Sequence, residues 1–222
     1  MAANGPATVA AILVAAGSGQ RLGAEVPKAF CVVAGRTLLE HAAARFAATV
    51  SGLVVVAPAD RCDEAAALTG AVVVPGGATR QESVAAGLAA LGDDVDVVLV
   101  HDVARPFVPA AVIDAVIAAV VGGADGAVPV VPLHDTIRRV DAAGEFVEVV
   151  DRSTLVAVQT PQGFRAGVLR AAHEAGRGRG VTDDAGLVEA LGGRVVAVSG
   201  ADEAFKITRP WDLAVAEAVA GG

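Results

Sequence analysis

The chain has 222 residues and a net charge of −8 at pH 7. This length fits one α/β domain, which we expect to span residues 1–222. The negative charge argues against a nucleic-acid partner, and no apolar run approaches the ~20 residues that cross a membrane. Cys31 and Cys62 are too few for a disulfide framework, and no basic stretch precedes the first apolar segment as in a signal peptide. We therefore expect a cytoplasmic protein without a membrane partner.

Strands and helices alternate along the first half of the chain. Apolar runs predict strands at 9–14, 53–57, 71–74, 95–100 and 127–131, and a short extended piece at 30–33. Thr37-x-x-Glu40 and Thr79-x-x-Glu82 are capping boxes that each begin a helix, and further helices are predicted at 61–68, capped by Asp60, and at 109–121. This alternation predicts a mostly parallel sheet with helices on both faces. Ligands of such sheets bind beyond the carboxyl ends of the strands.

The pattern changes between residues 132 and 159. Two strands at 133–140 and 145–150 flank a turn and predict a protruding β-hairpin arm. Beyond the arm, we predict strands at 155–158 and 194–198 and helices at 165–175, 182–191 and 210–219. Thr182 is the expected cap of the middle helix. We find no linker or repeat, and we expect no second enzyme domain in this polypeptide.

The segment 12–30, ILVAAGSGQRLGAEVPKAF, has the composition of a phosphate-binding loop. Small residues after a buried strand let the backbone approach an anion, and Arg21 and Lys28 add two fixed cations. It is not a Walker A loop, which needs a Gly-Lys pair, nor the dinucleotide fingerprint, because its three glycines are spaced one residue too far apart. A plain glycine-rich connection is the alternative. The phrase AAGxGxRxG followed by PK resembles the signature of sugar-nucleotide-type nucleotidyltransferases.

Two further segments follow predicted strands. The segment GGATRQES at 76–83 places a double glycine before a helix, where Ser83 could help to bind a base or a ribose; a loop with a capping box is the alternative. Asp102 comes at the end of the next strand. It is a suitable Mg²⁺ ligand, because Mg²⁺ prefers one or two carboxylates together with substrate phosphates. A loop-capping Asp paired with Arg105 would explain the same residue equally well.

Taken in order, the motifs resemble the 2-C-methyl-D-erythritol 4-phosphate cytidylyltransferase family of the non-mevalonate isoprenoid pathway, over nearly the full chain. The matching segments are AAGSGQRLG, PK, GGATRQESV, HDVARPF, DT, VDR, TPQ, TDD and FKITRPWDL. The resemblance implies a three-layer, Rossmann-like nucleotidyltransferase fold with a protruding hairpin arm. It also implies transfer of CMP from CTP to 2-C-methyl-D-erythritol 4-phosphate, with release of pyrophosphate. The chain departs from the family pattern at Ala204, where many members carry Asn, and at Val103, which is often Ala.

The resemblance implies a role for each site residue. The residues that would bind the nucleotide are Ala15, Ala16, Gly17, Gly19, Gly77, Ser83 and Val103. Asp102 would hold Mg²⁺ or another divalent cation, and the catalytic cations would be Arg21, Lys28, Lys206 and Arg152. The residues that would bind the polyol phosphate are Arg105, Thr136, Arg152, Thr160 and Thr182. The arm at 132–159 would act as a dimerisation subdomain and complete the site of a second copy with Thr136 and Arg152, which agrees with the marginal stability of an isolated two-stranded hairpin in water.

The implied chemistry needs no general base. The nucleophile would be a phosphate monoester, which is largely dianionic at neutral pH because its second pKa is about 6. The four histidines, of which His101 and His134 flank site segments, are accordingly expected in structural or surface positions. Two alternatives for the function are a ribitol-5-phosphate cytidylyltransferase and a non-catalytic binding protein on the same scaffold. The retained cations and Asp102 argue against the second.

Overall fold

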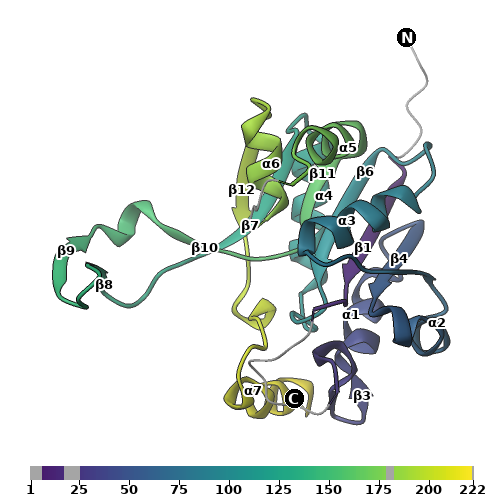
Figure 1. Ribbon diagram of the computed structural model, residues 1–222, viewed down its shortest axis with the longest axis horizontal. Coiled ribbons are helices and arrows are strands. Elements are labelled where there is room, and N and C mark those ends of the chain that lie inside the picture. The colour runs from purple at the N-terminus through teal and green to yellow at the C-terminus, as the bar shows by residue number, and fades with distance from the viewer. Residues whose placement is uncertain (1–6, 18–25, 179–182, 222) are drawn as a thin grey trace.

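The computed structural model describes residues 7–17, 26–178 and 183–221 (Figure 1). Within these residues, an eight-stranded sheet has the strand order β10-β7-β11-β6-β1-β4-β5, and β12 pairs with β7. Its strands are β1 (Val9–Val14), β4 (Gly52–Ala57), β5 (Val72–Pro75), β6 (Val97–Asp102), β7 (Gly126–Pro132), β10 (Val156–Val158), β11 (Gln162–Arg165) and β12 (Val195–Ser199). The helices are α1 (Leu38–Phe46), α2 (Cys62–Thr69), α3 (Arg80–Ala89), α4 (Ala110–Val121), α5 (Ala166–Ala175), α6 (Asp184–Ala190) and α7 (Pro210–Gly221).

The centre of the sheet is parallel. β1 pairs in parallel with both β4 and β6, β4 pairs in parallel with β5, and β12 pairs in parallel with β7. Two strands run the other way: β11 is antiparallel to β6 and β7, and β10 is antiparallel to β7. The predicted α/β class with a mostly parallel sheet is confirmed.

The two faces of β1 belong to two different cores, because successive side chains of a strand point to opposite faces. Ala11 and Leu13 pack in the core that is covered by α1, α2, α4 and α7. Ala10 and Ile12 pack in the core that is covered by α3, α5 and α6. Helix α3 lies very close to β1 because Gly87 has no side chain: a Cβ added to Gly87 would lie 2.6 Å from Ile12 Cγ2. Helices on both faces thus make the three layers that the resemblance implies.

The two predicted capping boxes are present. The Thr37 and Thr79 side chains each accept a hydrogen bond from the backbone three residues on, and Glu40 and Glu82 bond back to them. The prediction for Asp60 is wrong, because a 3-10 turn at Ala59–Arg61 intervenes and α2 begins at Cys62 without a side-chain cap. The cap of α6 is Asp183, not Thr182; its carboxylate accepts from the Gly186 N–H.

The sequence pattern does not predict strand β11, and it places Arg165 in the helix that follows. Its sequence QGFR has neither a long apolar run nor strict alternation. The strand packs tightly against α4: a Cβ added to Gly163 would lie 2.4 Å from Val116 Cγ1, so only glycine lets α4 pack this closely. The strand fills the gap between β6 and β7 and thereby holds the two halves of the sheet together.

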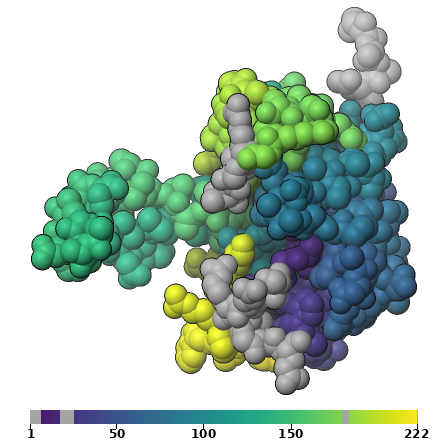
Figure 2. All heavy atoms as spheres, viewed as in Figure 1, coloured from purple at the N-terminus to yellow at the C-terminus, as the bar shows by residue number. Residues whose placement is uncertain are grey.

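The chain between β7 and β10 leaves the body of the molecule and forms the predicted arm (Figures 1 and 2). Strands β8 (Ile137–Val140) and β9 (Phe146–Val150) pair with each other in a separate sheet. The first strand begins at Ile137, so the predicted strand from residue 133 is too long. Phe146 is 68% exposed and Val149 61%. A second short hairpin joins β2 (Val32–Val33) to β3 (Arg36–Thr37).

Candidate active site

A cavity of about 660 Å³ lies at the carboxyl ends of β1, β5 and β6. This is the edge at which open α/β sheets bind their ligands. The loop after β1, the loop after β5 and the end of β6 each contribute to it. The described residues that line it are Val14, Ala15, Ala16, Gly17, Lys28, Ala29, Gly77, Ala78, Thr79, Arg80, Ser83, Asp102, Val103, Ala104 and Lys206.

The two loops are packed against each other without space for side chains. A Cβ added to Gly76 would lie 2.3 Å from Ala16 Cβ, so the small residues at both positions are needed for this contact. The Ser83 hydroxyl donates to the Thr79 carbonyl at 2.9 Å and accepts from the Gly77 N–H at 3.2 Å. Ser83 therefore shapes the loop that lines the cavity, and most of the predicted nucleotide-binding residues lie on these two loops.

Asp102 is the acidic side chain at the cavity, among the described residues that line it. Its Oδ2 accepts from Lys206 Nζ at 2.6 Å, and its Oδ1 accepts from Arg80 Nε at 3.2 Å. Burial alone would raise the pKa of Asp102, but Arg80 and Lys206 hold that pKa well below its ordinary value. The carboxylate is therefore ionised and carries two cationic partners. The alternative of an Asp102–Arg105 pair is not formed by the described side-chain hydrogen bonds, because those of Arg105 go to backbone carbonyls.

Thr160 and His101 support Asp102 from behind. The Asp102 N–H donates to Thr160 Oγ1 at 3.1 Å, and Thr160 Oγ1 lies 3.0 Å from His101 Nδ1. His101 Nε2 lies 3.0 Å from the Arg105 carbonyl, which fits a neutral ring that donates from Nε2 and accepts at Nδ1. Burial lowers the pKa of His101 to about 4, so the ring is neutral at pH 7. The structural role expected for His101 is confirmed.

Both lysines of the chain line the cavity. Lys28 follows Pro27 in a 3-10 turn, and its Nζ donates to the Ile207 carbonyl at 2.8 Å. Lys206 precedes Ile207, whose N–H donates to the Ala104 carbonyl at 2.8 Å. The segment around Lys206 is thereby attached to the loop after β6, which brings the two ammonium groups to one cavity from opposite ends of the chain.

Arg105 lies beside the cavity and is committed to the backbone. Its Nη1 donates to the Ala204 carbonyl at 2.7 Å, and its Nη2 donates to the Val158 carbonyl at 3.0 Å. The departure from the family pattern at Ala204 thus leaves this contact in place, because the backbone makes it. Val103 lines the cavity and is buried.

Thr136 and Arg152 do not reach the cavity of their own chain. Both lie on the exposed arm, where Arg152 Nη1 donates to the His134 carbonyl. Gly19, Arg21 and Thr182 lie outside the described residues. The structure thus brings together the predicted nucleotide-binding residues that it describes, the two lysines and Asp102, and it leaves the arm residues apart from them.

Two residues that sequence reasoning did not select are connected to the site. Arg80 bonds to both Asp102 and Asp184, and Asp184 bonds to His173 Nε2 at 2.9 Å. His173, expected at the surface or in packing, is buried, and its Nε2 is hydrogen-bonded to Asp184. Arg80 and Asp184 stand inside the motifs GGATRQESV and TDD, but no local spacing shows that they meet.

A family model described as IspD, 2-C-methyl-D-erythritol 4-phosphate cytidylyltransferase, matches residues 9–221. The chain belongs to this family. A relative of the same name from Frankia casuarinae is 52% identical over 95% of this chain and 80% of the relative. Another, from Streptomyces avermitilis, is 51% identical over 96% of this chain and 92% of the relative. The crystal structure of the enzyme from Thermus thermophilus superposes with a TM-score of 0.82 at 42% identity, covering 95% of this chain and 98% of that one.

Membership of the 2-C-methyl-D-erythritol 4-phosphate cytidylyltransferase family decides between the functional alternatives. The chain is a cytidylyltransferase of isoprenoid biosynthesis that uses CTP and 2-C-methyl-D-erythritol 4-phosphate. The expected enzyme class and fold are confirmed. In the described part of the chain, no helix combines the length and the apolar character that crossing a membrane requires.

Proposed function

We propose that CTP occupies the 660 Å³ cavity, with its triphosphate between Lys28 and Lys206. The observation that carries this proposal is the convergence of both lysines with an ionised carboxylate and two loops of mostly small residues at one cavity. The backbone N–H group of Ala16 is suited to a polar atom of the nucleotide, whereas that of Gly77 already donates to the Ser83 hydroxyl. Ala15, Gly17 and Val103 would form its walls.

The acceptor phosphate would attack the α-phosphorus of CTP in line, and pyrophosphate would leave. The main requirement is then to stabilise negative charge on the transferring group, so catalysis consists of positioning and electrostatic stabilisation. Lys28 and Lys206 would supply positive charge that is already in place before the reaction. His101 is unsuited to proton transfer because both ring nitrogens have protein partners. A dianionic acceptor makes such a base unnecessary.

Asp102 is the residue that would hold Mg²⁺ together with the phosphates of CTP. In the described residues, no group of three or more potential ligands could bind a metal by itself, which agrees with the preference of Mg²⁺ for a few carboxylates and substrate phosphates. The carboxylate is ionised, and its lone pairs exceed the two bonds that it accepts from Arg80 and Lys206. Bound Mg²⁺ would neutralise negative charge that develops on the leaving group.

Asp102→Asn should weaken both turnover of CTP and the response to Mg²⁺. The amide remains a hydrogen-bonding group of similar size, but it is a poorer ligand for a hard cation. The measurement is initial rate against Mg²⁺ concentration for the wild type and the variant. An unchanged Mg²⁺ titration in the variant would make Asp102 a structural partner of Arg80 and Lys206, and the metal would be held elsewhere.

The acceptor is tested directly by incubating the protein with CTP, Mg²⁺ and one polyol phosphate and measuring pyrophosphate. We expect release with 2-C-methyl-D-erythritol 4-phosphate and little with ribitol 5-phosphate. A reaction without acceptor controls for hydrolysis of CTP. Release only with ribitol 5-phosphate would contradict the proposed acceptor site, whereas no release with either would contradict the assignment of the cavity.

We also propose that the arm pairs two copies into a homodimer. Apolar side chains on β8 and β9 are exposed in the single chain, and the Arg138 guanidinium lies 4.3 Å from the centre of the Phe146 ring, which is itself 68% exposed. A two-fold contact would cover the same face in both copies. Arg152 and Thr136 would then be offered to the acceptor phosphate in the partner's site, where a planar guanidinium can bind bidentately.

The free thiols of Cys31 and Cys62 support the expected cytoplasmic location.

A further inference from the structure

Arg80 lines the cavity, yet the family resemblance gave it no role. It is the first residue of α3, and its guanidinium lies between two carboxylates. Nε donates to Asp102 Oδ1 at 3.2 Å, and Nη1 donates to Asp184 Oδ2 at 2.7 Å. The shorter of the two bonds is the one to Asp184.

Asp184 is fixed in turn by two other elements. Its side chain is 1% exposed, and its second carboxylate oxygen accepts from His173 Nε2 of α5 at 2.9 Å. Its backbone N–H donates to Gln162 Oε1 of β11 at 3.2 Å. Asp184 therefore has a position that is set by the sheet and by α5, independently of anything bound in the cavity.

The two carboxylates differ in how a ligand can reach them. Asp102 lines the cavity, so phosphates or a metal ion entering there would change its partners. Asp184 does not line that cavity, and a buried carboxylate is costly to leave without a cation. The Asp184–Arg80 pair is accordingly the bond that persists while the partners of Asp102 change.

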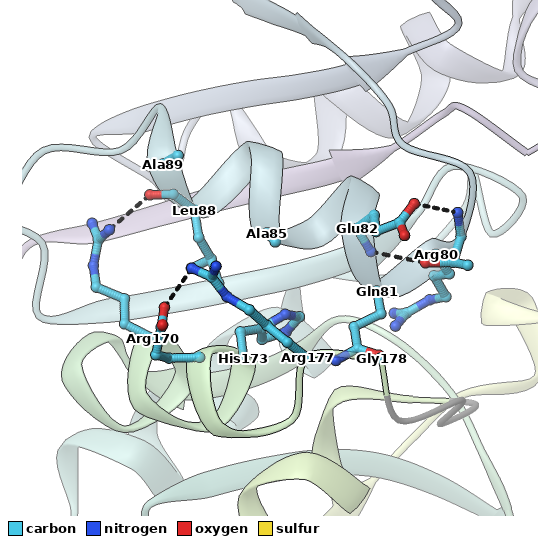
Figure 3. Close-up of a pocket in the computed structure, with 12 residues that line it drawn as sticks. Arg80, Gln81, Glu82, Ala85, Leu88, Ala89, Arg170, His173, Arg177 and Gly178 are labelled. Carbon is cyan, nitrogen blue, oxygen red and sulfur yellow. Dashed lines mark hydrogen bonds and ion pairs between the residues drawn. The ribbon is translucent and has the colours of Figure 1, made fainter.

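Arg80 also borders two cavities. Together with Thr79 it lines the nucleotide cavity and a second cavity of about 610 Å³ between α3 and α5. Figure 3 shows this second cavity, with Arg80 at one end and His173 between the two helices. Without an anchor, the Arg80 side chain could point into either cavity, and only one of these two orientations places its charge at the nucleotide.

We propose that Asp184 is a positioning residue of the cytidylyltransferase reaction, which holds the Arg80 guanidinium at the cavity wall for contact with the phosphates of CTP. His173 and Gln162 act one step further back, because they hold Asp184. The proposal rests on the assignment of the cavity to CTP. It differs from a purely structural role, in which Asp184 would only join α6 to α5 and the sheet.

The test is a double-mutant cycle with Asp184→Asn and Arg80→Ala, read as kcat and KM for CTP. Asp184→Asn removes the negative charge that holds Arg80 and leaves the guanidinium at most a hydrogen bond to a neutral amide oxygen, which is weaker. We expect kcat/KM for CTP to fall roughly 10- to 100-fold, as for the loss of one hydrogen bond to a charged group. In the Arg80→Ala background, Asp184→Asn should change kcat/KM less than about twofold, because a residue that acts through Arg80 has nothing left to position.

Val188→Ala is the matched control for stability. Val188 is fully buried on the same helix and does not line the nucleotide cavity. We expect it to lower the melting temperature while KM for CTP stays within about twofold of the wild type. An equal loss from Asp184→Asn with and without Arg80, or a loss of melting temperature alone, would overturn the proposal.

A second variant keeps the proposal testable if Asp184→Asn does not fold. Arg80→Lys keeps the positive charge on a partly exposed side chain but cannot reach two carboxylates with a planar fork. It should raise KM for CTP roughly tenfold, and an unchanged KM would overturn the proposal. Calorimetry of CTP binding to the wild type separates this proposal from the site assignment, since a wild type that does not bind CTP refutes the assignment itself.

Discussion

Lysine is rare in this chain, and both copies, Lys28 and Lys206, lie at one cavity. The other cations are arginines, many of which are used for structure: Arg170, for example, donates to the carbonyls of Leu88, Leu91 and Gly92. An ammonium is a compact charge with three rotatable donors, which suits a phosphate group whose charge moves during the reaction. At the residue scale, the site is thus distinguished by the type of cation as well as by its place.

Lys28→Ala should lower kcat roughly 10²- to 10³-fold, by analogy with the loss of one preorganised donor at a reacting group. The melting temperature should change little, because the side chain is only half-buried. Pyrophosphate release and thermal unfolding measure the two effects. Arg36→Ala, which removes an exposed cation outside the set of cavity-lining residues, is the control and should keep its turnover. Near-normal turnover of Lys28→Ala would exclude Lys28 from catalysis.

The lowered pKa of His101 predicts that the stability of the protein depends on pH. Its pKa in the folded protein is about 4, whereas an unfolded His titrates near 6.5. As the pH falls from 6.5 to 4, the unfolded state gains a proton that the folded state does not, so the free energy of unfolding should fall by about 3 kcal/mol.

The measurement for His101 is urea denaturation at several pH values in metal-free buffer. Other acidic groups also titrate at the low end, so the comparison is with His101→Gln, which retains one donor and one acceptor. The variant should lose less stability across this pH range than the wild type does. Parallel pH curves for the two proteins would show that His101 does not cause the loss.

At the scale of elements, the cavity exists because two strand-to-helix loops touch. The loop after β1 meets the loop after β5 where Ala16 and Gly76 lie side by side, and the Thr79 capping box fixes the start of α3 directly after the second loop. Three backbone segments therefore determine the shape of the site before any ligand binds. A small displacement of either loop should affect nucleotide binding more than folding.

Gly76→Ala should test this contact. The new Cβ would lie 2.3 Å from Ala16 Cβ, so the loops must move apart. We expect kcat/KM for CTP to fall roughly 10- to 100-fold, because small misplacements of binding groups slow a reaction strongly. Gly167→Ala is the matched control: no atom lies within 4 Å of its added Cβ, and it should keep activity and gain up to about 1 kcal/mol of stability. Unchanged kinetics in Gly76→Ala would show that the loops yield without cost.

At the scale of the whole molecule, the arm is the part that the single chain leaves incomplete. Val147 is 59% exposed and Phe146 68%, although both belong to a strand. A lone two-stranded hairpin is marginally stable in water, and these side chains need a surface. Mixing two inactive variants tests whether that surface is a second copy that shares its site.

The two variants are Lys206→Ala and Arg152→Ala, mixed after dissociation and reassociation. If Arg152 serves the partner, one site of each hybrid dimer contains both Lys206 and Arg152, and random reassociation should restore about a quarter of wild-type activity. If Arg152 serves its own chain, every site lacks one of the two residues. A mixture as inactive as its parents, with hybrid dimers demonstrated, would therefore exclude site sharing.

Much of this protein is determined by local sequence. The capping boxes at Thr37 and Thr79 could be predicted because their hydrogen bonds join residues three positions apart. The run that forms β1 could be predicted because a strand covered on both faces needs continuous apolar side chains. The position of Asp102 at a strand end, and hence beside the phosphate loop, follows from the alternation of strands and helices.

Only the tertiary structure decided the rest, because the contacts concerned join residues that are distant in the chain. Strand β11 pairs with β6 and β7, and its Gly163 closely approaches Val116; no periodicity reveals these contacts. Arg80 and Asp184 are 104 residues apart, and each by itself is an ordinary charge in the first turn of a helix. Their ion pair, and its reach to Asp102 and His173, exists because the sheet brings β6, β11 and the starts of two helices to one place.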